Sequence, residues 1–206
     1  ITLAVLAPMS GHLALLGEER FKVFQMSPDI VNDRGGVLGG RNIEVLAFDN
    51  KSNPQESLIV LRQAIDQDIH IIASSASNVA HAISDALVKH NARNPGQRVL
   101  FFDFNALDPV LTESKCNFWH FRFEVHSDTQ VEVLTVYMMR QPPVRKVYLL
   151  NQDYACGQAV SRAVTEMLAK RTDIHIVGGD VVPVGQFTVF APYSAQSTLL
   201  VPRPGL

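Results

Sequence analysis

Residues 69–88 read IHIIASSASNVAHAISDALV, and this stretch carries the strongest signal of the fold. Its first part, residues 69–73, is a short apolar run, which is typical of a strand buried on both faces of a sheet. After the pair Ser74-Ser75, apolar residues return at helical spacing from Ala80 to Val88. A buried strand followed directly by an amphipathic helix is typical of an α/β fold with a parallel sheet.

The same alternation of strand and helix patterns runs along most of the chain. Between the strand-like runs, apolar residues recur at three- and four-residue spacing, as in helices. Asn53-Pro54 predicts a helix start, because asparagine caps helices and proline suits the first helical position. The other strand-like runs are residues 1–6, 43–48, 99–104, 144–150 and 174–177. Alternating β and α units imply right-handed crossovers, so the sequence predicts a doubly wound α/β sheet.

Three places break this rhythm. The run FWHFRF, residues 118–123, follows four βα units, so it is either the crossing into a second lobe or an edge strand of the first. Pro28 predicts that the first helix is kinked or split. After residue 184 the periodicity ends, which predicts an irregular tail from about residue 185. We expect a nearly complete first lobe over residues 1–122 and a partial second lobe over residues 123–206.

Composition and charge exclude several classes of protein. With 206 residues, 47% of them hydrophobic, the chain can bury a sizeable core, which excludes a disordered or collagen-like protein. A formal charge of −2 gives no basic excess for nucleic acid. The apolar runs are far shorter than the roughly 20 residues that span a bilayer. No signal-peptide pattern precedes the first strand, which leaves open a cytosolic protein or a chain that begins at a mature boundary.

Motifs for catalysis are missing from the sequence. No phosphate-binding glycine loop follows the first strand, no Gly-x-Ser-x-Gly elbow occurs, and the seven histidines form no metal-binding pair on a helix. The sequence therefore predicts neither an enzyme nor a bound cofactor or metal, and we expect surface or capping roles for the histidines. Asp49, Asp103 and Asp153 follow strand ends, which leaves open a shared acidic metal site, although loop and capping roles are favoured.

The candidate binding site lies where the strand of residues 69–73 meets its helix. The small residues Ser74 to Asn78 leave backbone N–H groups open at a helix N-terminus, where the helix dipole favours a carboxylate or phosphate. Ordinary N-capping by Ser77 is the alternative. Asn105-Ala106-Leu107 ends the next strand, and ligands of open α/β sheets bind outside the carboxyl ends of strands. We expect Ser77→Ala to weaken ligand binding with little loss of fold stability.

Several short motifs, in order along the chain, resemble leucine/isoleucine/valine-binding proteins, the substrate-binding components of branched-chain amino-acid ABC transporters. Each motif is weak alone, but together they run in register from residue 1 to about residue 191. The motifs are Ala7-Pro8-Met9-Ser10-Gly11 with Gly17-Glu18, Asn32-Asp33-Arg34-Gly35-Gly36-Val37-Leu38-Gly39-Gly40-Arg41, Asp49-Asn50-Lys51-Ser52-Asn53-Pro54, Asp108-Pro109-Val110-Leu111-Thr112, and Asp153-Tyr154-Ala155-Cys156-Gly157.

The resemblance implies a type I periplasmic binding fold, with two Rossmann-like lobes that close on a small ligand without covalent chemistry. Hydroxyl and backbone donors of the first lobe then hold the ligand carboxylate, and the matching positions here are Ser75, Ser77, Asn78, Asn105, Ala106 and Leu107. Leu16 and Cys156 match positions that are often aromatic, and Tyr154 lies two residues before Cys156. Leucine and cysteine at these positions imply a wider pocket that stacks less on its ligand.

The resemblance also implies a function in transport. It predicts a protein of the periplasm or cell surface that captures an amino acid, amide or small carboxylate and delivers it to an ABC permease. A ligand-sensing regulator or receptor domain of the same fold is the alternative, and a nucleotide-using intracellular enzyme is less favoured. An oxidising compartment would allow Cys116 and Cys156 to pair.

Overall fold

A computed structural model describes residues 1–140 and 144–183 of the chain. The chain divides into two compact units, Ile1–Glu124 and Val125–Leu206, and each is described by itself. The division falls two residues after the one expected between residues 122 and 123. The tail expected to be irregular from about residue 185 lies outside the described residues.

The first unit is built on a five-stranded parallel sheet. Its strands stand in the order β2-β1-β3-β4-β5, and every neighbouring pair runs parallel. Their bounds are β1 Thr2–Ala7, β2 Glu44–Asp49, β3 Ile71–Ser74, β4 Leu100–Asp103 and β5 His120–Arg122. The apolar run at the end of β1, Ala4 to Ala7, is fully buried, because helices cover both faces of the sheet there.

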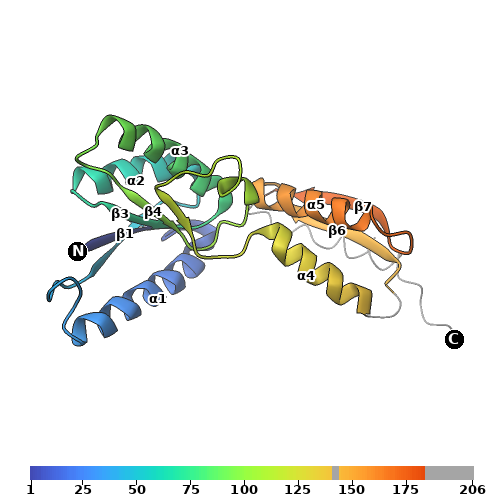
Figure 1. Ribbon diagram of the computed structural model, residues 1–206, viewed down its shortest axis with the longest axis horizontal. Helices are drawn as coiled ribbons and strands as arrows, with labels where there is room; N and C mark the ends of the chain where they lie inside the picture. The colour runs from blue at the N-terminus through green and yellow to red at the C-terminus, as the bar shows by residue number, and fades with distance from the viewer. Residues whose placement is uncertain (141–143, 184–206) are drawn as a thin grey trace. The chain divides into compact units, whose positions relative to one another are not determined.

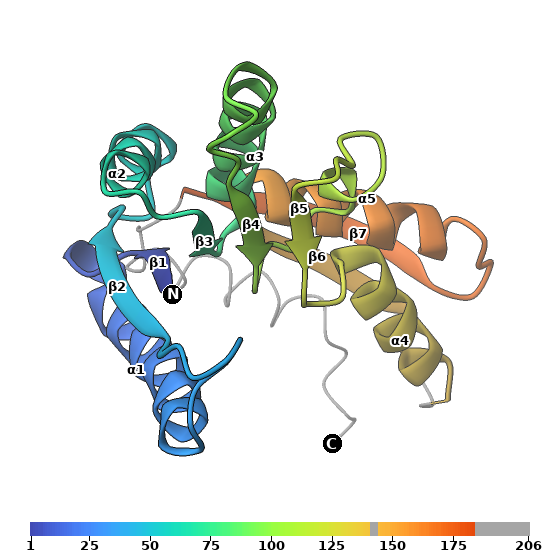
Figure 2. The same cartoon turned by 60° about the vertical axis from the view of Figure 1, so that its left-hand side comes forward.

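Helices lie on both faces of this sheet (Figures 1 and 2). Helix α1 (Ala14–Asp33) covers one face, where Phe21 and Phe24 pack against a small cluster of buried residues of β1 and β3. Helices α2 (Pro54–Asp66) and α3 (Ser77–Arg93) cover the other face and enclose the larger core. The prediction of a doubly wound sheet is confirmed for this unit. Short 3₁₀ turns, η1 (Gly11–Leu13) and η2 (Pro109–Leu111), precede α1 and follow β4.

Helix starts follow the sequence signals in one case and depart from them in another. Helix α2 begins as predicted, with the Asn53 side chain accepting hydrogen bonds from the N–H groups of Gln55 and Glu56. Pro28 was predicted to kink or split the first helix, and the split is wrong, because α1 continues through Pro28 as a single helix of 20 residues. Pro28 is buried, and a proline in a helix interior, which lacks the N–H donor, costs about 3 kcal/mol.

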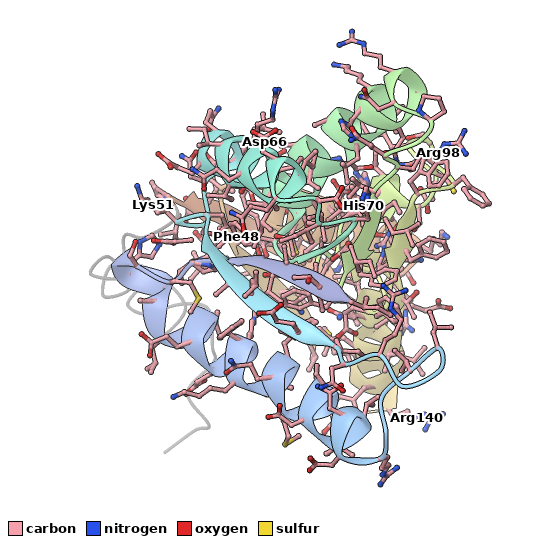
Figure 3. All side chains as sticks on the ribbon, turned by 90° about the vertical axis from the view of Figure 1, so that its left-hand side faces the viewer. Phe48, Lys51, Asp66, His70, Arg98 and Arg140 are labelled. Atoms are coloured by element: carbon pink, nitrogen blue, oxygen red, sulfur yellow. The ribbon has the colours of Figure 1, made fainter. Side chains whose placement is uncertain are left out.

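The aromatic run of residues 118–123 supplies the edge strand of the first unit rather than a strand of the second. β5 pairs with β4, and Phe101 donates its N–H to the carbonyl of Trp119. His120 is buried and stacks on Phe101 with ring centroids 4.8 Å apart, so the expectation of a surface or capping role is wrong for this histidine. Just before β4, at its amino end, His70 Nδ1 lies 3.0 Å from the carbonyl oxygen of Arg98 (both labelled in Figure 3).

The second unit shows the same alternation of helices and parallel strands. Its elements are α4 (Ser127–Arg140), β6 (Lys146–Gln152), α5 (Ala155–Leu168) and β7 (His175–Val182), with β6 and β7 paired in parallel. In each unit, a described glycine lets a helix backbone approach the end of the strand before it. A Cβ on Gly17 would lie 1.9 Å from the carbonyl oxygen of Pro8, and one on Gly157 would lie 2.0 Å from that of Gln152. No described helix of the chain could cross a membrane.

Candidate functional site

The connections that follow β3 and β4 lie side by side in the first unit. The two strands are neighbours, with Ser74 paired to Asp103 at their carboxyl ends. The β3–α3 connection carries Ser75 and continues into α3 at Ser77, and the β4–η2 connection carries Asn105. The structure therefore brings together the two segments that the sequence singled out, at the sheet edge where α/β folds bind ligands.

Helix α3 begins at this edge with an unusual cap. Ala76 is the N-cap residue, with φ +71° and no side-chain hydrogen bond, and Ser77 is the first helical residue. Ordinary N-capping by Ser77, the alternative reading of this stretch, is therefore not what the structure has. The first N–H groups of a helix have no acceptor within the helix, and the dipole adds partial positive charge there. This end of α3 favours an anion.

Ser77 links the two connections. It is 1% exposed, and its Oγ accepts hydrogen bonds from the N–H of Leu107 at 3.1 Å and of Asp108 at 3.2 Å. Removing this oxygen would leave two N–H groups without their acceptor, and one of them belongs to Asp108, which is buried. Against the expectation from the sequence, these contacts predict that Ser77→Ala lowers fold stability.

Asp103 fixes the first half of the β4–η2 connection. Its buried Oδ1 accepts hydrogen bonds from the N–H of Asn105 at 3.1 Å and of Ala106 at 2.6 Å. Together with the two bonds to Ser77, four consecutive N–H groups, residues 105–108, bind side-chain oxygens of the protein. This connection therefore offers a ligand its carbonyl oxygens and the Asn105 side chain, rather than its backbone N–H groups.

His81 reinforces the same attachment one helical turn after Ser77. Its Nε2 lies 2.8 Å from Asp108 Oδ2, and Asp108 Oδ1 caps η2 by accepting the N–H of Val110 at 3.1 Å. Residues four apart on a helix share one face, so Ser77 and His81 both point at the β4–η2 connection. A serine and a histidine on α3 thus hold the loop that forms half of the candidate site.

Arg20, on α1, joins the site and was missed by the sequence analysis. Its Nη1 donates to Ser75 Oγ at 3.0 Å and its Nη2 donates to Asn105 Oδ1 at 2.9 Å, so one guanidinium touches both connections. The partners lie 55 and 85 residues further along the chain. No local pattern could have indicated these contacts. The site thus contains a cation next to the positive end of α3.

The remaining predicted residues fall in two places. In the first unit, Leu16 is 41% exposed and lies one helical turn before Arg20, Asn78 is half-buried in the first turn of α3, and Ala106 is fully buried. In the second unit, half-buried Tyr154 is the N-cap of α5 and Cys156 is buried in its first turn. Cys116 and Cys156 are not joined by a disulfide in this structure.

The acidic residues at strand ends have structural partners. Asp49, the last residue of β2, accepts hydrogen bonds from the N–H of Met9 and Lys51 and from the Ser10 hydroxyl. Burial alone would raise the pKa of Asp49, but these hydrogen bonds outweigh burial and hold the pKa below its usual value. Among the described residues, no group of His, Cys, Asp or Glu could hold a metal ion. Loop-fixing roles account for Asp49 and Asp103.

Comparison with known proteins decides the family. The model of a family described as "Periplasmic binding protein" matches residues 1–197. The chain belongs to the periplasmic binding protein family. The structure fits this membership, because it is an α/β protein with parallel sheets in each unit and matches solved structures of type I periplasmic binding proteins.

Individual relatives agree with this assignment. The Leu/Ile/Val-binding protein homolog 4 of Brucella abortus is 31% identical over 168 residues, which cover 81% of this chain and 40% of the relative. The crystal structure of a leucine-, isoleucine-, valine-, threonine- and alanine-binding protein from Brucella ovis, in its closed conformation, is 27% identical with a TM-score of 0.79. This likeness covers 97% of this chain and 51% of that one.

A second solved structure extends the likeness in fold. A solute-binding protein of an ABC transporter from Rhodopseudomonas palustris, solved with 3,4-dihydroxybenzoic acid, has a TM-score of 0.81 at 18% identity, covering 97% of this chain and 52% of that one. The relatives are named as binding proteins rather than as enzymes. This periplasmic binding protein chain thus spans about half the length of the relatives that it matches.

Proposed function

We propose that this chain acts in solute capture for an ABC transporter, outside the cytoplasm, in the periplasm or attached to the cell surface. It binds a small amino acid, or a related carboxylate or amide, without chemical change and delivers it to a membrane permease. The observation that carries the proposal is the meeting of the β3–α3 and β4–η2 connections at the carboxyl edge of the sheet, held together by Ser77 and Arg20. Relatives named for binding amino acids support it.

Each unit contributes residues to the proposed site. In the first unit, the start of α3 supplies N–H donors and the β4–η2 connection supplies carbonyl oxygens, a pairing that suits a ligand with both a carboxylate and an ammonium group. In the second unit, the proposal includes the residues at the start of α5. The proposed site consists of Leu16, Ser75, Ser77, Asn78, Asn105, Leu107, Tyr154 and Cys156, with fully buried Ala106 supporting the β4–η2 connection from the core.

A thermal-shift screen tests this function. The purified chain is melted with each of the common amino acids, their amides and small aliphatic and aromatic carboxylates, and with glucose as a non-anionic control. A ligand at 100 times its Kd stabilises the folded state by about 2.7 kcal/mol, so a true ligand raises Tm by several degrees. A folded chain whose Tm responds to none of these acids, amino acids or amides contradicts the proposal.

A pair of variants on one helix ties binding to the site. Asn78→Ala changes the first turn of α3, and Asn94→Ala changes the residue that ends the same helix. The two positions are separated by 16 residues, about 24 Å along a helix. We expect Asn78→Ala to weaken binding of the ligand found in the screen, measured by isothermal titration calorimetry, and Asn94→Ala to leave Kd unchanged. Equal effects of the two variants would remove the start of α3 from the site.

A further inference from the structure

We propose that helix α1 carries a docking surface for a second copy of this chain, so that two copies associate through their α1 helices, packed antiparallel about a two-fold axis. The surface consists of Val23, Met26 and Ile30, on the side of α1 that faces away from the sheet. None of these residues belongs to the candidate site, so the association goes beyond the proposed function and needs no ligand.

Helix α1 is apolar on two opposite sides. Its inner side packs against the sheet through Phe21 and Phe24 and contains buried Pro28. Two residues further along the chain from each of these three, about 200° around the helix, stands another large apolar residue. These residues are Val23, Met26 and Ile30. A helix that only covers a sheet needs one apolar side, so the second side calls for a partner.

The outer side has no cover within the described part of the chain. Val23 is 62% exposed, Met26 is 58% exposed and Ile30 is 45% exposed. Figure 2 shows α1 on the outside of its unit. Spacings of three and four residues align the three side chains in one ridge along the helix. Single exposed apolar residues are common on protein surfaces, but a row of large ones along one helix face is typical of a contact surface.

The charges beside this ridge fit a second copy of the same helix. Exposed Lys22 and Asp29 stand on one flank of the ridge, and neither forms an ion pair within the described residues. In an antiparallel pair with Met26 facing Met26, Val23 faces Ile30 of the second copy and Lys22 faces its Asp29. The two-fold axis produces each of these contacts twice. A parallel pair would bring like charges together, so the charges favour the antiparallel arrangement.

The length of α1 sets the expected strength of the association. The helix has 20 residues and is about 30 Å long, so one helix pair buries less than the roughly 800 Å² per partner of a standard interface. Glu19, one turn before Val23, lies opposite the Asp33-Arg34 step of the second copy, whose two charges balance. We therefore expect a reversible dimer with a Kd in the micromolar range.

Sedimentation velocity on the full chain tests the association. Between about 5 and 500 µM, we expect wild-type protein to shift from monomer towards dimer. Met26→Glu places two carboxylates at the two-fold axis and should raise the dimer Kd by at least about tenfold. Ile59→Glu is the matched control, because Ile59 is 54% exposed on α2, outside the ridge, and this variant should leave Kd unchanged.

Charge reversal tests the antiparallel register. Lys22→Asp alone, or Asp29→Lys alone, opposes like charges twice in each dimer and should raise Kd by about three- to tenfold at low salt. The double variant restores opposite charges and should return Kd to near the wild-type value. In a parallel pair, by contrast, each single reversal would leave like charges opposed as before and Kd unchanged. Circular dichroism of each variant checks that the chain stays folded.

Three results would overturn the proposal. A folded chain that stays monomeric up to about 500 µM does not associate through α1, and the ridge is then covered by something other than a second copy. A dimer that is equally stable in Met26→Glu is held by another surface. Single charge reversals that leave Kd unchanged would remove the antiparallel pairing. Solute binding stands or falls separately, because the thermal-shift screen measures it without reference to α1.

Discussion

Ser77→Ala should destabilise the first unit although it removes only one oxygen atom. The Ser77 hydroxyl accepts two backbone N–H groups, and a buried N–H that loses its acceptor costs about 1–3 kcal/mol. Asp108 is 7% exposed and bears the full cost, whereas half-buried Leu107 can recover part of its own from water. We expect the free energy of unfolding to fall by about 2–4 kcal/mol.

The chain allows this loss to be measured in one unit alone. Trp119 is the only tryptophan of the sequence and belongs to the first unit, so its fluorescence during urea titration follows the unfolding of that unit. Ser84→Ala on the same helix is the matched control, because buried Ser84 accepts a single side-chain bond, from Asn117 at 2.9 Å. Ser77→Thr keeps a hydroxyl and should recover part of the loss.

Two results would refute this reasoning. A loss below about 0.5 kcal/mol in Ser77→Ala would mean that the two N–H groups find other acceptors, so that Ser77 does not fix the loop. A loss in Ser84→Ala as large as that in Ser77→Ala would mean that any buried hydroxyl of α3 matters equally. An unchanged slope of unfolding free energy against urea in both variants is needed for the comparison to hold.

Three further predictions follow from other contacts. Gly17→Ala should lower the free energy of unfolding of the first unit, measured by urea titration, by more than about 3 kcal/mol, because its Cβ would lie 1.9 Å from a carbonyl oxygen. Gly96→Ala has open space around its Cβ and should cost little. The pKa of Asp49 is lower in the folded than in the unfolded protein, so the ionised carboxylate stabilises the fold fully above the pKa of the unfolded state, and this stabilisation is lost as pH falls through the pKa of the folded state. Between about pH 5 and pH 2, the urea midpoint of Asp49→Asn should therefore change less than that of wild type. Ellman's reagent should modify exposed Cys116 quickly in native protein and buried Cys156 only after denaturation, and two rapidly reacting thiols in the native state would contradict the burial of Cys156.

The sequence allowed the repeating units to be predicted, because their signals are local. The run at residues 69–73 and the Asn53 cap each depend on neighbouring residues, and strand and helix appear where they were expected. The resemblance in motif order also predicted the family correctly. Pro28 was misjudged because packing of α1 against the sheet is a tertiary effect that no local rule contains.

The candidate site was only partly predictable for the same reason. The two connections were identified, since strand ends of a parallel sheet meet at one edge, but the direction of their hydrogen bonds was not. Ser77 and Asn105 were expected to face a ligand, and the structure shows both also accepting hydrogen bonds from the protein. Arg20 reaches the site from α1, and its partner Asn105 lies 85 residues away in the sequence. The residues around either position give no local pattern from which this contact could be predicted.

The four satisfied N–H groups of residues 105–108 have a consequence for how a ligand would be received. A flexible loop must lose conformational entropy when it closes on a ligand, and this loss weakens affinity. Here Asp103 and Ser77 impose the loop's shape during folding, before any solute arrives. A ligand that contacts this loop should therefore meet a surface whose shape is already set, and ordering of the loop should add little to the entropic cost of binding.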